Sequence, residues 1–583
     1  MLKKLLGSVR QYKKQSILAP LTVALEVVVE CMIPFLTAQL INAIENGAGM
    51  PTILQYGLGL LAMALLSLSF GIMAGYFCSV ASCGFAKNLR HDLFYRIGEF
   101  SFSNIDRFST SSLVTRLTTD VSNVQHAYMM LVRTAIRCPF MLIFAFVMSI
   151  RLGGSLSLVF AVVLPILAFA LFFIISRVMP LFRRLFKKYD KLNESVQENI
   201  AGMRVVKSFV REEYERDKFG RASEELCRNF TRAEKMLAFN DPVMKFCMYT
   251  SMLLLSYFSA RVIVSNFLPD DPTAMGVGNF TGMITYSMQI LISMMMVSMV
   301  FVMVTMAIES ARRITEVLSE ESDLQNPAEP VYTVADGSIT FENVSFRYSE
   351  KAERNALQNI DLSIASGETI GIIGGTGSSK STLVNLISRL YDASAGTVKV
   401  GGLDVREYDL ETLRNQVAVV LQKNVLFSGT IKENLRWGNP DATDEELIHA
   451  CRLACADDFV QSFPEGYDTY IEQGGTNVSG GQKQRLCIAR ALLKKPKILI
   501  LDDSTSAVDT HTDAMIRRAM REEIPGTTKI IIAQRVSSVQ DADRIVVMDG
   551  GRIESCGTHE ELLADSPIYR EVYESQTKTG GEE

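Results

Sequence analysis

The stretch GGTGSSKST, Gly374 to Thr382, follows an apolar strand at 369–373 and precedes a helix with apolar residues at helical spacing. This strand, glycine-rich turn and helix match the P-loop pattern G-x-x-x-x-G-K-[ST] at every specified position except one. Backbone N–H groups of such a turn converge on a polyphosphate, while Lys380 reaches the terminal phosphates and Ser381 ligates magnesium. The stretch therefore predicts an α/β domain that binds a nucleotide.

The departure from the P-loop pattern is at its sixth position, which is Ser379 instead of glycine. A serine can donate its backbone amide, so we expect binding to survive, but to be weaker if this residue must adopt a positive φ. The residues expected to contact the phosphates are Gly374, Thr376, Gly377, Ser378, Ser379, Lys380, Ser381 and Thr382.

The part of the chain before residue 310 contains long apolar runs. The whole chain has 583 residues, of which 48% are hydrophobic and 21% charged. Several runs are uncharged and long enough to cross the roughly 30 Å hydrocarbon layer of a membrane. Others fit less cleanly because they contain charged residues. We predict a transmembrane domain over 1–310 with six spans, at about 16–44, 51–86, 127–150, 152–176, 243–268 and 281–308.

The distribution of Lys and Arg predicts the orientation of these spans. Both residues are frequent before the first span and in the loops at 87–116 and 183–235, and they are absent from 45–50 and 265–280. Since cytosolic flanks retain positive charge, we expect a multi-pass protein of the cell membrane with both termini in the cytosol. The first apolar run is too long for a cleavable signal and should remain as an anchor. The two basic loops should continue the spans as helices, with reversals near 106–120 and 207–218.

A linker separates this half from a soluble domain. The range 311–337 includes NPAEPVYTVADG, whose prolines and glycine are typical of a linker, and the nucleotide-binding domain should follow over 338–583. The ten cysteines show no metal or disulfide spacing. No basic stripe with interleaved aromatic residues is present in the soluble half, so we expect no nucleic acid partner.

Two later motifs give the P-loop its context. VSGGQ at 478–482 is followed by KQRLCIARALL, and ILILDD comes some residues later. Together these motifs resemble the nucleotide-binding domain of ATP-binding cassette (ABC) proteins. Six spans and one cassette resemble a multidrug-type half-transporter of the type IV exporter group. The resemblance implies a multidomain fold, with an all-α six-helix transmembrane domain plus an α/β P-loop ABC domain whose helical subdomain lies at about 424–481.

The resemblance also implies ATP and Mg²⁺ as cofactors and gives further residues a role. Tyr348 matches the aromatic residue that stacks on adenine, Gln422 the glutamine that senses magnesium, and Asp502 the aspartate that orients the metal. Asp509 matches the loop that passes between the two sites of a cassette dimer. The residues matching the signature loop, which closes over ATP held by the opposite cassette, are Val478, Ser479, Gly480, Gly481 and Gln482.

Two catalytic positions differ from the family. Asp503 stands where the family has the glutamate that positions the attacking water, and Gln534 replaces the histidine that contacts the terminal phosphate. The shorter carboxylate is drawn back by roughly 1.5 Å, and displacements of about 1 Å can cost about 100-fold in rate. Glutamine cannot carry the charge of an imidazolium.

These departures predict a slow or inactive site in this chain, whereas its signature loop is intact apart from Val478, where the family has leucine. The chain then resembles the degenerate-site subunit of bacterial heterodimeric exporters, which implies a second, non-identical half-transporter that supplies the catalytic Glu and His. A homodimeric exporter with slow ATPase activity is the alternative, and an ATP-gated regulatory subunit is another.

Residues in the spans suggest where a substrate binds. Glu26 and Glu30 lie one helical turn apart in the first span, where ionisable groups are functional candidates that could attract a cation. The alternative is an ion pair with Arg133 or Arg137. The methionine-rich last span, with Met295 and Met299, would suit varied apolar ligands or simply pack against lipid. We expect export of hydrophobic or amphipathic small molecules, such as drugs or lipids, with peptides as the alternative.

Overall fold

The computed structural model describes residues 1–265, 276–349, 352–503 and 508–579. The chain forms two compact units. The first comprises Met1–Gly98 and Ser109–Glu320, and the second comprises Glu99–Phe108 and Glu321–Glu583. Each unit is described by itself.

The described residues of the first unit form helices joined by short turns. A helix satisfies all of its backbone hydrogen bonds internally, which hydrocarbon surroundings require. Its α-helices are α1 (Leu2–Gly7), α2 (Lys13–Glu45), α3 (Met50–Gly98), α5 (Thr110–Thr115), α6 (Val121–Val132), α7 (Thr134–Gly153), α8 (Leu158–Ala201), α9 (Met203–Ser208), α10 (Glu212–Ala238), α11 (Asn240–Ser265) and α12 (Val277–Ser319). Short 3-10 turns occupy Arg10–Tyr12 and Gly154–Ser157, and Arg116–Asp120 is a π-helix.

Among the described residues, five helical segments are long and apolar enough to cross a membrane: Arg10–Glu45, Met50–Gly98, Thr110–Leu181, Glu212–Ile263 and Val277–Ser319. The third has 72 residues and contains two of the predicted spans, 127–150 and 152–176. The chain turns between these two at Gly154, which has a φ of 50°. Five of the six predicted ranges fall within these segments. The sixth, 243–268, begins within Glu212–Ile263 and extends beyond it, and its last residues, 266–268, lie outside the described residues.

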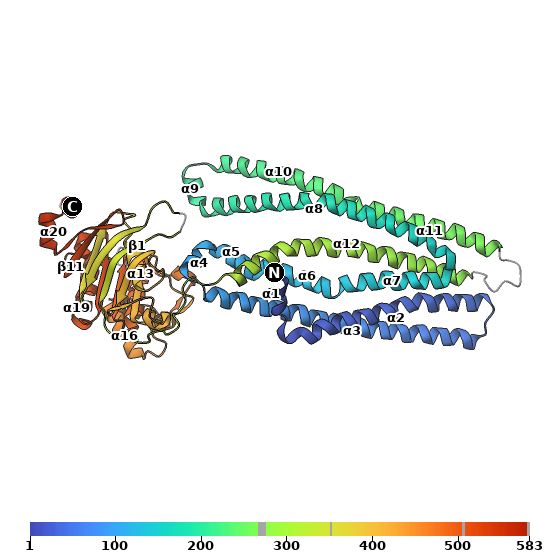
Figure 1. The fold of residues 1–583 in the computed structure, drawn as a ribbon, viewed down its shortest axis with the longest axis horizontal. Helices are drawn as coiled ribbons and strands as arrows, with labels where there is room; N and C mark the ends of the chain where they lie inside the picture. The colour runs from blue at the N-terminus through green and yellow to red at the C-terminus, as the bar shows by residue number, and fades with distance from the viewer. Residues whose placement is uncertain (266–275, 350–351, 504–507, 580–583) are drawn as a thin grey trace. The chain divides into compact units, whose positions relative to one another are not determined.

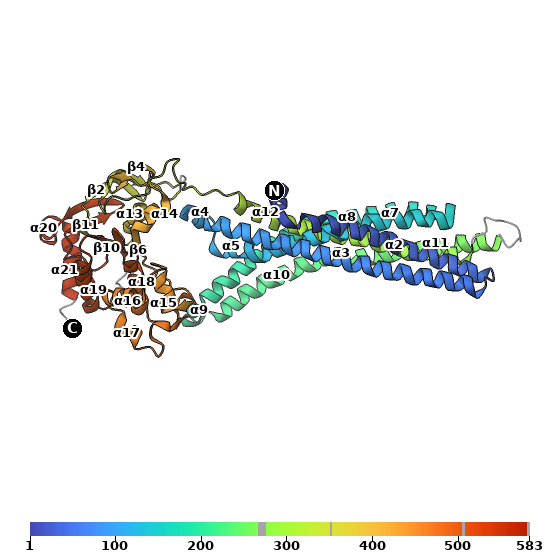
Figure 2. The same ribbon diagram turned by 90° about the horizontal axis from the view of Figure 1, so that it is seen from below.

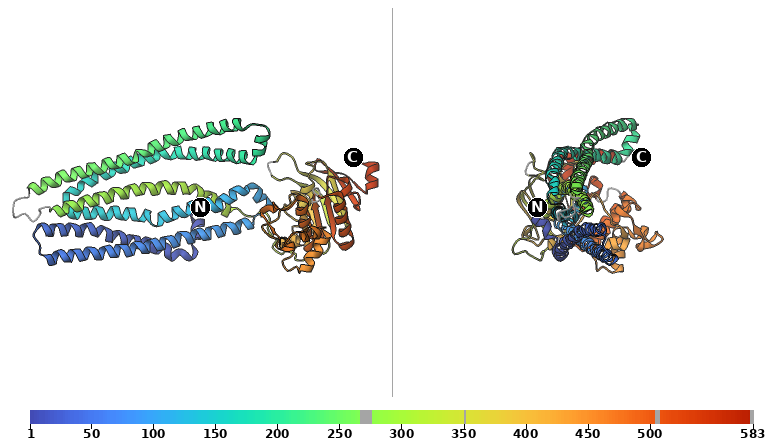
Figure 3. Two further views of the ribbon diagram at one scale, coloured as in Figure 1. Left: turned by 180° about the vertical axis from the view of Figure 1, so that it is seen from behind. Right: turned by 90° about the vertical axis from the view of Figure 1, so that its right-hand side faces the viewer.

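Small residues allow the helices of the first unit to approach closely. In Figures 1 and 3, α2 and α3 lie side by side, and α8 runs alongside α10 and α11. Helix α12 packs on α2 and α7. A Cβ atom at Gly278 of α12 would lie 2.1 Å from the backbone oxygen of Ala38 in α2, so only glycine fits there. Tyr286 is fully buried and donates a hydrogen bond to the Cys31 carbonyl oxygen.

The second unit contains an α/β core (Figure 2). A six-stranded sheet has the order β12-β11-β3-β10-β9-β6, with β12 antiparallel to β11 and the other pairs parallel, and a four-stranded antiparallel sheet has the order β2-β1-β4-β5. A short pair joins β7 and β8. The strands are β1 (Ile339–Phe346), β2 (Leu357–Ile364), β3 (Thr369–Gly374), β4 (Ala395–Val400), β5 (Leu403–Asp404), β6 (Val417–Val420), β7 (Gly429–Thr430), β8 (Tyr470–Ile471), β9 (Ile498–Asp502), β10 (Thr528–Ile532), β11 (Arg544–Asp549) and β12 (Arg552–Gly557).

The second unit also contains helices, several of which lie within the range 424–481 predicted as a helical subdomain. The helices are α4 (Phe102–Arg107), α13 (Lys380–Ile387), α14 (Leu410–Gln416), α15 (Ile431–Arg436), α16 (Asp444–Leu453), α17 (Asp457–Gln461), α18 (Gly480–Leu493), α19 (Thr510–Glu523), α20 (His559–Asp565) and α21 (Pro567–Thr579). The predicted fold class is confirmed: a helical transmembrane region and a sheet-containing domain. Two boundaries differ, because α12 continues to Ser319 inside the range predicted as linker, and Glu99–Phe108 belongs to the second unit.

Candidate functional site

Parallel pairing brings the carboxyl ends of three strands to one edge of the six-stranded sheet. Ile532 at the end of β10 is in register with Ile372 of β3 and with Asp502 of β9. Ligands of open α/β sheets bind at this edge. A cavity of about 310 Å³ lies here, lined by Gly374, Thr376, Gly377, Ser379, Lys380, Ser381, Thr382, Gln422, Asp502, Asp503, Ile532 and Gln534.

The P-loop forms one wall of this cavity. Lys380 begins α13 and its ammonium donates hydrogen bonds to the backbone oxygens of Gly374 and Gly375, at 2.8 and 2.9 Å. Burial lowers the pKa of Lys380, whereas the charges of Asp502 and Asp503 act in the opposite direction. An ammonium group in this position can bind the terminal phosphates of a nucleotide. Ser378, the remaining predicted contact, is buried within the loop.

Ser379 has a φ of 69° and a ψ of 26°, which is the left-handed conformation that glycine adopts without strain. Weaker ATP binding is expected if Ser379 must adopt a positive φ, and its backbone adopts one here. In a residue other than glycine, the left-handed conformation destabilises the folded state by roughly 1–2 kcal/mol.

The end of β9 carries the group best suited to hold a metal ion. Asp502 is 7% exposed, and burial together with the neighbouring Asp503 raises its pKa, opposed by a hydrogen bond from Ser381 and by Lys380. Mg²⁺ prefers oxygen ligands and usually takes few from the protein. The Ser381 hydroxyl and the Asp502 carboxylate fit that requirement, with the Gln422 side chain on the same cavity wall.

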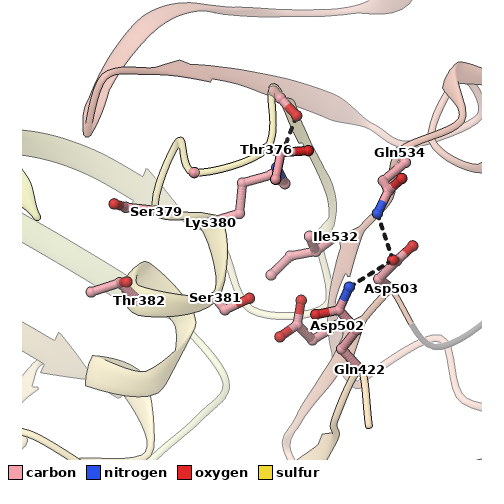
Figure 4. Close-up of a pocket in the computed structure, with 12 residues that line it drawn as sticks. Thr376, Ser379, Lys380, Ser381, Thr382, Gln422, Asp502, Asp503, Ile532 and Gln534 are labelled. Carbon is pink, nitrogen blue, oxygen red and sulfur yellow. Dashed lines mark hydrogen bonds between the residues drawn. The ribbon is translucent and has the colours of Figure 1, made fainter. Parts of the chain in front are cut away.

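Asp503 lies between two side-chain amides (Figure 4). Its Oδ2 atom accepts a hydrogen bond from Gln422 Nε2 at 3.1 Å and another from Gln534 Nε2 at 2.8 Å. The backbone of Asp503 has a φ of 46°, so this residue is also left-handed. We call Gln422, Asp503 and Gln534 the Asp503 cluster. It contains both catalytic positions, 503 and 534, at which this sequence differs from the family.

The predicted adenine-stacking residue lies beside the cavity without lining it. Tyr348 is half exposed, and its hydroxyl is 2.9 Å from that of Thr382. Its ring makes edge contacts with Phe346 and Tyr391 at centroid distances of 4.8 and 5.3 Å. These contacts leave part of the ring available for a base.

The signature-loop residues do not line this cavity. Ser479 caps α18, where its hydroxyl accepts from the Gln482 backbone and the Gln482 side chain accepts from the Ser479 backbone. Val478 precedes this cap, and Gly480 and Gly481 begin the helix. Asp509 caps α19 by accepting a hydrogen bond from the Thr512 backbone N–H, and the hydrogen bonds from Thr512 lower its pKa.

Two neighbours of the site were missed by the sequence analysis. Ile532 closes the cavity from β10, and its place was available only from the sheet order. Tyr391, after α13, donates a hydrogen bond to Asp106 Oδ2 at 2.7 Å and so joins the second unit's core to α4. No local motif marks this pair.

The candidate substrate residues lie in the first unit. Arg137 bonds Glu26 at 2.7 Å and Glu30 at 2.5 Å, which is the ion-pair alternative. These three residues line a second cavity of about 610 Å³, which we call the transmembrane cavity. Met296 of α12 lines it, but Met295 and Met299 are not among its lining residues.

Comparisons with known proteins agree with this architecture. Residues 16–308 match the family model for the ABC transporter transmembrane region, and residues 357–506 match the ABC transporter model. A solved structure of a bacterial Atm1-family ABC exporter with ATP bound superposes with a TM-score of 0.83 at 24% identity, covering 97% of this chain and 99% of that chain. This likeness concerns the fold.

Curated relatives are similar over nearly their whole length. An uncharacterized ABC transporter ATP-binding protein of Mycobacterium tuberculosis is 37% identical over 574 residues, covering 98% of this chain and 97% of the relative. The uncharacterized ABC transporter ATP-binding protein YfiB of Bacillus subtilis is 35% identical over 585 residues, covering 100% of both. With one transmembrane region and one ATP-binding domain, the chain is a half-transporter of the ABC transporter family, an ATPase coupled to transport.

Proposed function

We propose that this chain is one subunit of a heterodimeric exporter in a bacterial cell membrane, with both termini and the nucleotide-binding domain in the cytosol. It moves hydrophobic or amphipathic small molecules, such as drugs or lipids, outward by alternating access. The exporter-like fold and the bacterial relatives support this role. Its partners are membrane lipids, the substrate and a second, non-identical half-transporter.

The Asp503 cluster carries the heterodimer proposal. A carboxylate that orients the attacking water must face the terminal phosphate, and it acts only within hydrogen-bond reach of that water. The side chain of Asp503 is one methylene shorter than that of glutamate, and its Oδ2 atom already accepts hydrogen bonds from two side-chain amides. Gln534 is the closer donor and is neutral, so it adds no positive charge to stabilise the transition state. The site is therefore arranged to bind ATP and Mg²⁺ and to hydrolyse slowly.

In this arrangement each group has a separate role. Lys380 and the P-loop amides bind the phosphates, and Ser381, Asp502 and Gln422 hold Mg²⁺. Tyr348 stacks on the adenine. The signature loop, pre-formed by the Ser479 cap, completes the site of the partner subunit, whose catalytic Glu and His perform fast hydrolysis.

The test compares Mg²⁺-dependent ATPase activity of the purified chain alone and with a candidate partner. We expect slow turnover alone and a rate about 100-fold higher in the complex. In the complex, Asp503→Asn should be nearly silent, whereas Ser479→Ala should abolish fast turnover. Thr558→Ala is a matched control because Thr558 forms the same capping box at α20. Brisk hydrolysis by the chain alone would refute the heterodimer.

Export itself has an independent test. Inside-out vesicles that contain the complex should accumulate an amphipathic dye in an ATP-dependent manner. Ser381→Ala in this chain and the corresponding change in the partner separate the contributions of the two sites. ATP-dependent ion current without dye accumulation would contradict export and favour a gated channel.

A further inference from the structure

The transmembrane cavity is lined by charged and thioether side chains from several helices of the first unit. Glu26 and Glu30 come from α2, Arg133 from the junction of α6 and α7, and Arg137 from α7. Met296 of α12 adds a thioether, and other methionines line the cavity beside it. The cavity thus combines charges of both signs with an adaptable apolar wall.

The charges are unequally paired. Arg137 holds both carboxyl groups, one with each terminal nitrogen. With both carboxyl groups ionised, Glu26, Glu30 and Arg137 together carry one excess negative charge. We call these three residues the ion triad. Glu30 is the more accessible carboxylate, since 32% of its side chain is exposed against 12% for Glu26.

Arg133 is the complementary positive charge. It lies one helical turn before Arg137, and its side chain is exposed. Within the described residues no carboxylate lies within ion-pair distance of it. Its backbone, with a φ of −103° and a ψ of −67°, interrupts the helix between α6 and α7. The cavity therefore has a positive site at Arg133 and a negative site at the ion triad.

The cavity lining also includes hydrogen-bond acceptors that lack a donor among the described residues. Glu26 Oε2 and Gln289 Oε1 are buried, and neither has a hydrogen-bond donor among the described residues. Both residues line the cavity. A buried acceptor without a donor is unfavourable because it has lost its hydrogen bonds to water. A modest side-chain rotation that meets a ligand N–H group would recover part of this free energy.

We infer that the transmembrane cavity binds zwitterionic amphiphiles whose head group carries a phosphate or carboxylate and an N–H-bearing ammonium. This inference rests on the proposed export function and specifies its substrate class. The anionic group pairs with Arg133, the ammonium pairs with the ion triad, and the apolar tail lies on the methionines. A purely cationic ligand leaves Arg133 unpaired, and a purely anionic one meets the excess negative charge of the triad. Either mismatch is costly where water is scarce.

Native mass spectrometry of the purified transporter, with its partner, tests this preference. The probes share one chain length: lauroyl lysophosphatidylethanolamine, lauroyl lysophosphatidic acid, monolauroylglycerol and dodecylamine. We expect the zwitterion to bind at least about tenfold more tightly than each other probe, or about 1.4 kcal/mol. Equal binding of all four probes, or tighter binding of a singly charged one, overturns the inference.

Two charge changes should alter the preference in opposite directions. Arg133→Gln leaves the excess negative charge of the ion triad, so this variant should bind dodecylamine preferentially. Glu30→Gln leaves a neutral pair of Glu26 with Arg137 and an unpaired Arg133, so this variant should bind lysophosphatidic acid preferentially. Arg133→Lys should restore the zwitterion preference. Arg151→Gln removes the same charge from α7 outside the cavity and should leave selectivity unchanged. Variants that bind the four probes with wild-type ratios overturn the inference.

The outcome can be separated from that of the proposed function. ATP-dependent dye accumulation is measured with the same preparation. Transport without head-group selectivity overturns the zwitterion site and leaves export supported. Selectivity without any ATP-dependent transport overturns export and leaves the binding site supported.

Discussion

Gln534 Nε2 donates a hydrogen bond to Asp503 Oδ2 at 2.8 Å, so the two catalytic positions that differ from the family are in direct contact. Restoring both should restore catalysis. We expect Asp503→Glu with Gln534→His to raise the Mg²⁺-dependent ATPase rate of the purified chain about 100-fold, because the longer carboxylate reaches the water and the imidazole contacts the phosphate. Each single change should give much less. Adding Ser381→Ala should remove the gain, and unchanged rates with intact ATP binding would contradict the prediction.

Ser379 provides a test of backbone strain in the P-loop. The left-handed backbone of Ser379 destabilises the folded state by roughly 1–2 kcal/mol. Glycine removes this strain, but its greater freedom in the unfolded chain offsets about 0.5–1 kcal/mol of the gain. Ser379→Gly should therefore raise the midpoint of thermal unfolding slightly, and Ser379→Val, which has a branched Cβ, should lower it. Because this strain is expected to weaken binding, Ser379→Gly should also lower the dissociation constant of ATP, by up to about tenfold. An unchanged dissociation constant would contradict weaker binding and would show that the strain is the same with and without nucleotide.

The sequence could predict the P-loop because its strand, turn and helix are contiguous in the chain. The Asp503 cluster could not be predicted in this way. Its glutamines are 81 and 31 residues from Asp503, and they meet it because β9 lies between β6 and β10 in the sheet. Strand order is a property of tertiary packing. The same holds for Tyr391 and Asp106, which are 285 residues apart.

For the transmembrane half, the sequence could predict apolar ranges but not which methionines face a cavity. Met295, Met296 and Met299 are equivalent in composition, and a rotation of α12 by a fraction of a turn decides which of them lines the cavity. From the sequence, the arginine of the ion triad could be narrowed only to Arg133 or Arg137, because the spacing of Glu26 and Glu30 does not determine which arginine lies beside them. The structure selects Arg137.

Glu368 predicts a pH dependence of stability. Burial raises the pKa of Glu368, but the hydrogen bonds from Arg544 and the Ala365 amide outweigh it and hold the pKa below the usual 4.5. Arg544 binds both carboxylate oxygens, at 2.6 and 3.0 Å. A depressed pKa stabilises the folded state at pH values above 4.5, and this stabilisation is lost as the pH falls through the lower folded-state pKa.

Glu368→Gln should accordingly lower the thermal unfolding midpoint at pH 7, by an amount equivalent to about 1–2 kcal/mol. The difference from the wild type should shrink as the pH falls below the usual glutamate value. Glu342→Gln is the control, because Glu342 bonds Lys399 at an exposed site where an ion pair contributes little. A pH-independent difference would contradict the assignment.

Tyr391 should couple α4 to the nucleotide site. Its hydroxyl binds Asp106, while its ring contacts Tyr348 at 5.3 Å. Tyr391→Phe keeps the ring and removes the hydrogen bond, so ATP affinity should persist while substrate stimulation of ATPase activity in the complex falls at least about fivefold. Tyr467→Phe is a matched control, since Tyr467 bonds Asp457 within the same unit and away from α4. Equal losses in both variants would indicate a general structural effect.

The ion triad predicts a stability pattern that a simple loss of contacts would not give. Arg137→Gln leaves two carboxylates close together without a cation, and breaking a buried pair in this way typically costs about 3–5 kcal/mol. We expect little monodisperse protein after membrane extraction of this variant. The triple change Glu26→Gln, Glu30→Gln and Arg137→Gln removes every charge of the triad, so its recovery and thermal midpoint should approach those of the wild type. If the single variant is as stable as the wild type, or the triple variant is the least stable, the charges of the triad do not determine folding.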